Sequence, residues 1–383
     1  MIHIQSFRPR LRPGAARRIT AFSCTLFMSM FLIVSTHTVS AQDASSQIKA
    51  EIDRLQESLK SKPISNPDFP DINSAIGNAL KDSNAALAAG HLYVSLEGLG
   101  QAEDFLPGAR SVEEKAEAIK DSLPAFESEW EKASVQLTAL DKSARQIDWS
   151  HAPAGVRAIA EAAQGRTLPL LEGGRGFASA TKPKDGLFYM GEAQGEAGFA
   201  LFVSRLNFRR KATPISLRSV LPELLALQQK TNAAFQPPRS IDMHLRFIAL
   251  NSTIKFAREL DSSRSYAGAL YQYLEAVRHY GMLNPAVPDA ARQAALRTAV
   301  ADELKKADAA RQDNSIAEIF LERAYGWLNH ADGAAPSDND WRAARVIVDE
   351  VLPAYAAAIK PAAPAHQFAG RTATLTLVRW PYT

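Results

Sequence analysis

The stretch Ser240–Pro285, SIDMHLRFIALNSTIKFARELDSSRSYAGALYQYLEAVRHYGMLNP, decides the fold that we expect for this chain of 383 residues. It predicts two helices joined by a short turn. The first helix is expected to begin at Ser240, because Pro237 and Pro238 prevent a helix before it and the Ser240 hydroxyl can accept a hydrogen bond from a free amide of the first turn. Apolar residues then recur at alternating steps of four and three, as on one face of a helix. They are Met243, Phe247, Leu250, Ile254 and Ala257.

A second apolar flank on this helix is formed by Ile241, Leu245 and Ile248. Because a helix that is apolar on two flanks needs cover on both, we expect neighbouring elements on two sides of it. The segment Asp261–Ser265 supplies turn residues before the second helix, which Gly281 and Pro285 are expected to end. The packing face of the second helix alternates large and small residues, namely Tyr266, Ala269, Tyr273, Ala276 and Tyr280.

This alternation extends across both helices, at Phe256, Ala257, Leu260, Tyr266, Ala269, Tyr273 and Ala276. In this respect the hairpin resembles the tetratricopeptide-type helical repeat. The same spacing recurs at Leu92, Ser95, Leu99 and Ala102, and again at Trp341, Ala344, Val348 and Val351. The copies begin 174 and 75 residues apart, and neither separation is a multiple of the family's period of about 34 residues. The resemblance, which covers about a third of the chain, implies stacked hairpins that offer a binding surface; the alternative is an irregular helical bundle.

The first 41 residues have the pattern of a secretory signal peptide. Met1–Arg18 contains five arginines and no acidic residue, Ile19–Val34 is an apolar run, and Val39-Ser40-Ala41 suits a cleavage site. We therefore expect cleavage after Ala41, export to the periplasm or the exterior, and no stable membrane span in the mature chain.

Loss of this segment changes the charge of the protein. The formal net charge falls from +3 for the whole chain to −2 for residues 42–383, because five arginines and no acids are removed. A nearly neutral chain gives no reason to expect nucleic acid or an anionic membrane as a partner. The one cysteine, Cys24, also lies in the segment, so the stability of the mature chain is expected to depend on apolar burial without disulfides.

The remaining chain predicts an all-α fold, an irregular stack or bundle of antiparallel helical hairpins with one short C-terminal strand. We divide it into an N-terminal helical region (42–150), a middle helical region (151–238), a C-terminal helical-hairpin region (239–360), and a linker with a terminal strand (361–383). The segment Gly165–Gly186 is rich in Gly and Pro and is therefore predicted to be a loop. Because it lacks the spacing of a phosphate-binding loop, we expect a plain connecting loop. In the next predicted helix, Gly191, Gly195 and Gly198 share one side and suit close contact with another helix.

Catalytic and metal-binding patterns are absent from the sequence. The histidines after residue 41 form no HExxH motif, and there is no GxSxG, so we expect neither a metal nor a cofactor. A basic group, Arg205, Arg209, Arg210 and Lys211, is a candidate contact site for a partner.

Two main functional hypotheses follow. The first is a non-enzymatic exported scaffold that binds a protein or peptide between its hairpins. The second is an exported carbohydrate-active enzyme on paired helices, a polysaccharide lyase or hydrolase, in which Tyr271 or His279 acts as acid or base and Arg278 neutralises a uronate. A ring of helices with these three residues lining a cleft would favour the enzyme, whereas an open stack would favour the scaffold. A third possibility, a carrier for a small apolar ligand, would need an enclosed apolar cavity.

Overall fold

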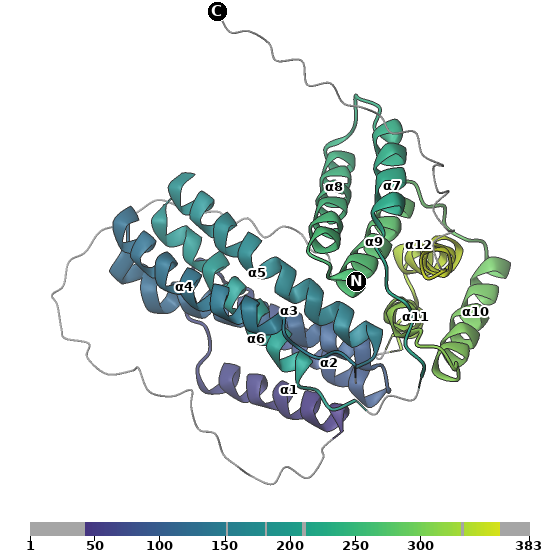
Figure 1. The fold of residues 1–383 in the computed structure, drawn as a ribbon, viewed down its shortest axis with the longest axis horizontal. Helices are drawn as coiled ribbons and strands as arrows, with labels where there is room; N and C mark the ends of the chain where they lie inside the picture. Colours follow the sequence, from purple (N-terminus) through teal and green to yellow (C-terminus); the bar gives the residue numbers. More distant parts are fainter. Residues whose placement is uncertain (1–42, 151, 181, 209–211, 331–332, 361–383) are drawn as a thin grey trace, which may run out of the picture.

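The computed structural model of the protein describes residues 43–150, 152–180, 182–208, 212–330 and 333–360 (Figure 1). Within these ranges the chain is helical and contains no β-sheet, and a single parallel bridge joins Thr213 to Gln312. The predicted all-α class is therefore confirmed. The expected signal peptide and the expected strand at residues 372–380 lie outside the described residues.

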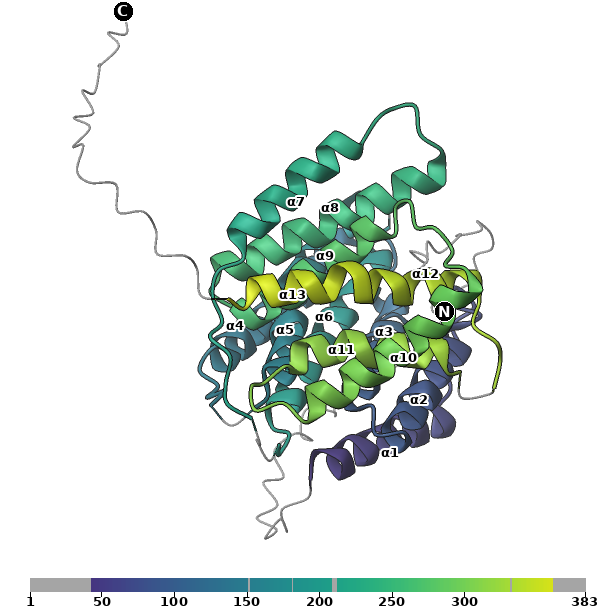
Figure 2. The same ribbon diagram turned by 90° about the vertical axis from the view of Figure 1, so that its right-hand side faces the viewer.

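Helices α1 to α6 form one body of the molecule, and α7 to α13 form a second body beside it (Figure 1 and Figure 2). The elements of the first body are α1 (Ala44–Ser61), α2 (Ile72–Ala88), α3 (Leu92–Ile119), α4 (Leu123–Ala144), α5 (Ala154–Ala180), the 3-10 turn η1 (Pro183–Asp185) and α6 (Gly186–Ser204). Those of the second are α7 (Leu221–Ala234), α8 (Ile241–Ser262), α9 (Tyr266–Gly281), α10 (Ala290–Asp308), α11 (Ser315–Leu328), α12 (Asp338–Val346), the π-helical η2 (Ile347–Val351) and α13 (Leu352–Ala358). None of these helices is long and apolar enough to span a membrane.

Helices α3 and α6 cross closely because glycine lines the contact. A Cβ atom on Gly195 would lie 3.0 Å from the carbonyl carbon of Glu103 and closer still to its oxygen. That carbonyl is free of its usual helical partner, since Pro107 stands four residues later and has no N–H. Gly191 meets the backbone of Pro107 in the same way, whereas Gly198 has nothing within 4 Å. The predicted close contact is thus confirmed for Gly191 and Gly195 and wrong for Gly198.

The predicted loop at Gly165–Gly186 is also wrong, because α5 continues unbroken through most of it. Pro169 lies inside the helix, and two of its glycines, Gly165 and Gly174, are points of contact with neighbouring helices. A Cβ on Gly165 would lie 2.6 Å from the Leu260 side chain of α8, and one on Gly174 would lie 2.9 Å from a backbone oxygen of α6. Packing between helices here outweighs the poor local helix propensity of glycine and proline.

The predicted α8–α9 hairpin is present. Ser240 accepts a hydrogen bond from the Met243 amide at the start of α8, as expected of a cap, and the face containing Phe247 and Leu250 is buried. Helix α9 is buried on all sides from Ala267 to Val277, beyond the single face predicted from the tyrosines. Its neighbours include α5, α8, α7 and η2, so α9 is central to the second body.

The second apolar flank of α8 is not covered as predicted. Ile241, Leu245 and Ile248 are 77%, 55% and 60% exposed, and we refer to these three residues as the α8 stripe. The α7–α8 hairpin projects from the second body (Figure 1 and Figure 2), and within the described ranges no element packs over the stripe. The prediction was wrong because periodicity identifies apolar positions without identifying what covers them.

Several helices begin at amides that are satisfied by carboxylates from distant parts of the chain. The amides of Tyr93 and Val94 donate to the Glu322 carboxylate (2.8 and 2.9 Å), and the Ala154 amide donates to Asp313 (2.7 Å). The Val220 amide donates to Asp261 (2.8 Å), and the Gly268 amide donates to Glu161 (2.8 Å). A helix N-terminus leaves free amides and a partial positive charge, so each carboxylate is well placed there. These contacts join α3 to α11 and α5 to α9, and so hold the two bodies together.

Candidate functional site

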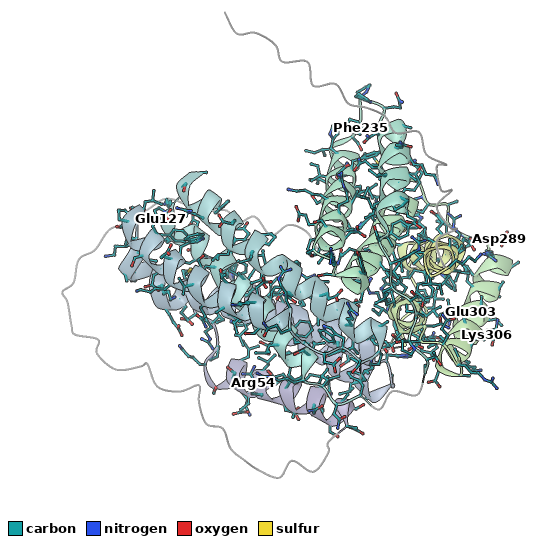
Figure 3. All side chains as sticks on the ribbon, in the orientation of Figure 1. Arg54, Glu127, Phe235, Asp289, Glu303 and Lys306 are labelled. Atoms are coloured by element: carbon teal, nitrogen blue, oxygen red, sulfur yellow. The ribbon has the colours of Figure 1, made fainter. Side chains whose placement is uncertain are left out.

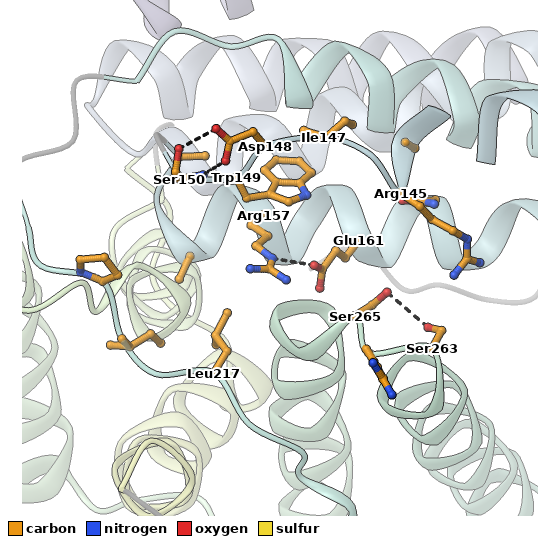
Figure 4. A pocket seen from close by; sticks show the side chains of 17 residues that line it. Arg145, Ile147, Asp148, Trp149, Ser150, Arg157, Glu161, Leu217, Ser263 and Ser265 are labelled. Carbon is orange, nitrogen blue, oxygen red and sulfur yellow. Dashed lines mark hydrogen bonds and ion pairs between the residues drawn. The ribbon is translucent and has the colours of Figure 1, made fainter. Parts of the chain in front are cut away.

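A cavity of about 690 Å³ lies where the two bodies meet (Figure 4). We call it the junction cavity. It is bordered by the α4–α5 connection, the first turns of α5, the connection before α7 and the α8–α9 turn. Its lining includes Arg145, Trp149, Arg157, Glu161, Leu217 and Arg264.

Two of the cavity's cations are paired within the protein. Arg145 donates to Asp141 through Nε (2.8 Å) and Nη2 (3.3 Å). Arg157 donates from Nε to Glu161 (2.6 Å), as Figure 4 shows, and no other described residue accepts from its two terminal nitrogens. The other oxygen of Glu161 accepts from the Gly268 amide. Glu161 is therefore fully engaged, while Arg157 retains donors that are free to meet a ligand.

The third cation, Arg264, has an unusual backbone. Its φ of +64° is in the left-handed region, and its amide donates to Asp261 while the next amide, that of Ser265, donates to Leu260. These two bonds define a Schellman motif, in which glycine is the preferred residue at the left-handed position. Helix α2 ends in the same motif with a glycine, Gly90, at φ +83°. The Arg264 side chain is exposed and makes no hydrogen bond or ion pair with another described residue.

Apolar side chains complete the walls of the junction cavity. Trp149 and Ile147 come from the α4–α5 connection, and Ile215 and Leu217 come from the connection before α7. Figure 4 shows Trp149, Arg157 and Leu217 among the side chains that line the cavity. The cavity thus combines a flat aromatic surface with guanidinium donors.

Tyr271, Arg278 and His279 are brought near one another at an ion-pair network outside the junction cavity. Tyr271 is 7% exposed, its hydroxyl donates to Glu97 (2.7 Å), and it accepts from Arg323 Nη2 (2.6 Å). Arg323 also pairs with Glu97 through Nε (2.6 Å). None of these side chains lines the junction cavity.

The network continues through Glu275, which pairs with Arg323 and with Arg278 (2.8 Å). We call Glu97, Tyr271, Glu275, Arg278 and Arg323 the Arg323 network. Burial alone would raise the pKa of Glu275, but the two guanidinium groups hold it well below its usual value. Burial, reinforced by Arg278, lowers the pKa of His279 to about 4, so this imidazole is neutral at pH 7. Burial also raises the pKa of the Tyr271 hydroxyl, which keeps its proton.

A second acid cluster lies between α3, α5 and α6. Glu196 is buried and pairs with Arg166, while one oxygen of Asp104 is buried without a hydrogen-bond partner in the described chain. Burial and then the charge of Glu196 raise the pKa of Glu192 to about 7, and the same two causes raise that of Asp104. These acids face neighbouring helices, and neither Glu192 nor Glu196 lines the junction cavity.

Of the predicted basic group, Arg205 is exposed at the end of α6, and residues 209–211 lie outside the described residues. In the described ranges, no group of three or more His, Cys, Asp or Glu side chains is placed to hold a metal ion. Comparison of the chain with known protein families, with curated proteins and with solved structures finds no significant match in any of the three.

The sequence does not single out Arg157, Glu161 or Arg264, because Arg264 lies far along the chain from the other two and the three belong to no motif. One local signal existed for Arg264. The run Asp261–Ser265 (DSSRS) predicts the turn that ends α8, and a long charged side chain is unusual at the glycine-preferring position of such a turn.

Proposed function

We propose that the protein is an exported, non-enzymatic helical scaffold that binds a protein or peptide partner through the α7–α8 hairpin. The observation that carries this proposal is the α8 stripe. Its three aliphatic side chains follow one another at steps of four and three, so they form one line along the helix. All three are more than half exposed.

A continuous apolar line on a projecting hairpin differs from scattered exposed leucines, which are ordinary on protein surfaces. Covering it would remove three large aliphatic side chains from water, which contributes on the order of 1 kcal/mol each. Polar residues flank the line, since Asp242, His244 and Arg246 are all exposed. An apolar centre with a polar rim suits an amphipathic helix or another apolar segment of a partner.

Export through a cleaved signal peptide and the resemblance of the α8–α9 hairpin to a tetratricopeptide repeat belong to the same proposal. The enzyme hypothesis has less support from the geometry, because the hydroxyl of Tyr271 and the guanidinium of Arg278 are engaged in the Arg323 network. Turnover of polyuronides by the purified protein would reverse this preference.

The proposal is tested by paired charge substitutions. Leu245→Asp with Ile248→Asp disrupts the stripe, and Val135→Asp on α4 is the matched control, because Val135 is a 65% exposed aliphatic residue in the other body. We expect capture of the tagged protein from its native host, after mild crosslinking, to give a reproducible partner with the wild type and the control but not with the stripe variant. Retention of the partner by the stripe variant, or a blank with the wild type, would contradict the proposal.

A further inference from the structure

We propose that the junction cavity binds a small organic anion, with its carboxylate or phosphate held by Arg157 and Arg264 and its flat apolar part against Trp149. This inference rests on a different surface from the α8 stripe, so it does not depend on the proposed function. The described lining contains three arginines and two acids, Asp148 and Glu161.

The available guanidinium donors of the cavity favour an anion. Arg145 is paired with Asp141, and both oxygens of Glu161 are occupied by Arg157 and a backbone amide. The terminal nitrogens of Arg157 and the whole guanidinium of Arg264 are then the donors without an acceptor among the described residues. A guanidinium presents paired N–H groups that match the oxygens of a carboxylate or a phosphate.

The backbone of Arg264 supports the same assignment. A non-glycine residue in the left-handed region costs about 1 kcal/mol, and the Arg264 side chain makes no hydrogen bond or ion pair with another described residue in return. Gly90 shows that this chain uses glycine in the equivalent turn of α2. A turn that holds an unpartnered arginine beside a cavity is better explained by a ligand than by the stability of the fold.

The size and walls of the cavity define the ligand class. A volume of about 690 Å³ is typical of sites for metabolite-sized molecules. Trp149, Ile147 and Leu217 suit a planar or apolar group. A purely apolar ligand would leave the guanidinium donors without hydrogen-bond acceptors, so it fits the site less well. The cavity therefore differs from the enclosed apolar cavity that a carrier for apolar ligands would need.

The test uses fluorinated probes observed by ¹⁹F NMR. The probes are 4-fluorobenzoate, 4-fluorophenyl phosphate and the neutral 4-fluorobenzamide, each titrated against the expected mature chain, residues 42–383. The variants are Arg264→Gly and Arg157→Gln. Lys120→Gly is the matched control, because Lys120 is a second residue with positive φ (46°) whose side chain does not line the cavity.

We expect at least one anionic probe to bind the wild type and the Lys120→Gly variant equally well, and the benzamide to bind more weakly. Each arginine substitution should weaken that binding about tenfold or more, since a hydrogen bond to a charged group contributes more than one factor of ten. The benzoate and phosphate titrations show which anion the site prefers. Arg264→Gly removes backbone strain, so its loss of binding cannot be attributed to unfolding.

Three results would overturn the inference. They are equal binding of the benzamide, binding of the anions that both arginine variants retain, and absence of binding at millimolar probe. A fourth result concerns a Leu245→Asp variant titrated with the same probes. If this variant lost anion binding and Arg264→Gly kept it, the probe would lie on the α8 stripe, and a site in the cavity would again be refuted.

Discussion

The close crossing of α3 and α6 predicts that two glycine-to-alanine substitutions in one helix have opposite effects. At Gly195 the new Cβ would lie 3.0 Å from the Glu103 carbonyl carbon, 3.1 Å from the Asp104 Cα, and closer still to the Glu103 oxygen. All three are backbone atoms, so no side-chain rotation relieves the overlap and the two helices must separate. At Gly198 nothing lies within 4 Å, and the residue is exposed.

The magnitudes follow from these distances. Overpacking of this kind costs about 1–3 kcal/mol and more where the backbone must move, while alanine improves helix propensity by about 1 kcal/mol. Gly195→Ala should therefore lower the free energy of unfolding by about 2 kcal/mol, and Gly198→Ala should raise it by up to about 1 kcal/mol. The two variants should thus differ by about 3 kcal/mol.

Urea unfolding followed by far-UV circular dichroism measures this difference directly. The comparison is valid if both variants unfold with the same dependence on urea as the wild type, because that slope reports the surface exposed on unfolding. If Gly195→Ala were as stable as Gly198→Ala, the close contact between α3 and α6 described above would be refuted.

Three further predictions concern the turns, the acid cluster and the Arg323 network. Arg264→Gly should raise the free energy of unfolding by about 1 kcal/mol and Gly90→Ala should lower it by a similar amount, because both residues occupy the left-handed position of a Schellman motif. Thermal melts in which both substitutions shift the melting temperature in the same direction would contradict this prediction. Glu192→Gln should gain stability relative to the wild type as the pH rises from 5 to 8, by up to about 3 kcal/mol. The wild type loses stability over this range because the pKa of Glu192 is raised to about 7 in the folded protein, which therefore holds a proton that the unfolded chain has released above pH 4.5. Urea titrations of both proteins at several pH values measure the effect. A difference in stability that does not change with pH would show that the pKa of Glu192 is not raised. Arg323→Met should cost about 3–5 kcal/mol, because it removes the cation that Glu97 pairs with and one of the two cations that pair with Glu275. Lys306→Met, at the exposed α10 ion pair in Figure 3, should change stability by less than about 0.5 kcal/mol, and comparable losses in the two variants would argue against a buried network.

Features that depend on neighbouring residues could be predicted from the sequence. The Ser240 cap is set by local chemistry, namely a hydroxyl beside the free amides of the first helical turn. The all-α class follows from periodicity over many segments, each of which needs only one apolar face. These inferences hold because the physical cause lies within a few residues of its effect.

Features that depend on distant residues could not be predicted in this way. Glycine and proline made α5 resemble a loop, and the reason for its helical conformation is contact with α6 and α8. The Arg323–Glu97 pair joins residues 226 positions apart, and no spacing rule connects them. The exposed α8 stripe is a third case, because apolar periodicity alone does not distinguish a face covered by the same chain from one left open.

Contact between the α8 stripe and a partner is tested most directly by site-specific photocrosslinking. A photoreactive benzoylphenylalanine would replace Leu245 in one protein and Val135 in another, since both side chains are exposed but lie in different bodies. Figure 3 shows the hairpin end, marked by Phe235, well separated from the far end of α4, marked by Glu127. After irradiation in the native host, we expect a discrete adduct with a second protein when the photoreactive residue is at position 245 and no adduct when it is at position 135. Contact between the stripe and a partner would be contradicted by any of three results. They are no adduct from position 245, the same adduct from both positions, and an adduct only with a second copy of this chain.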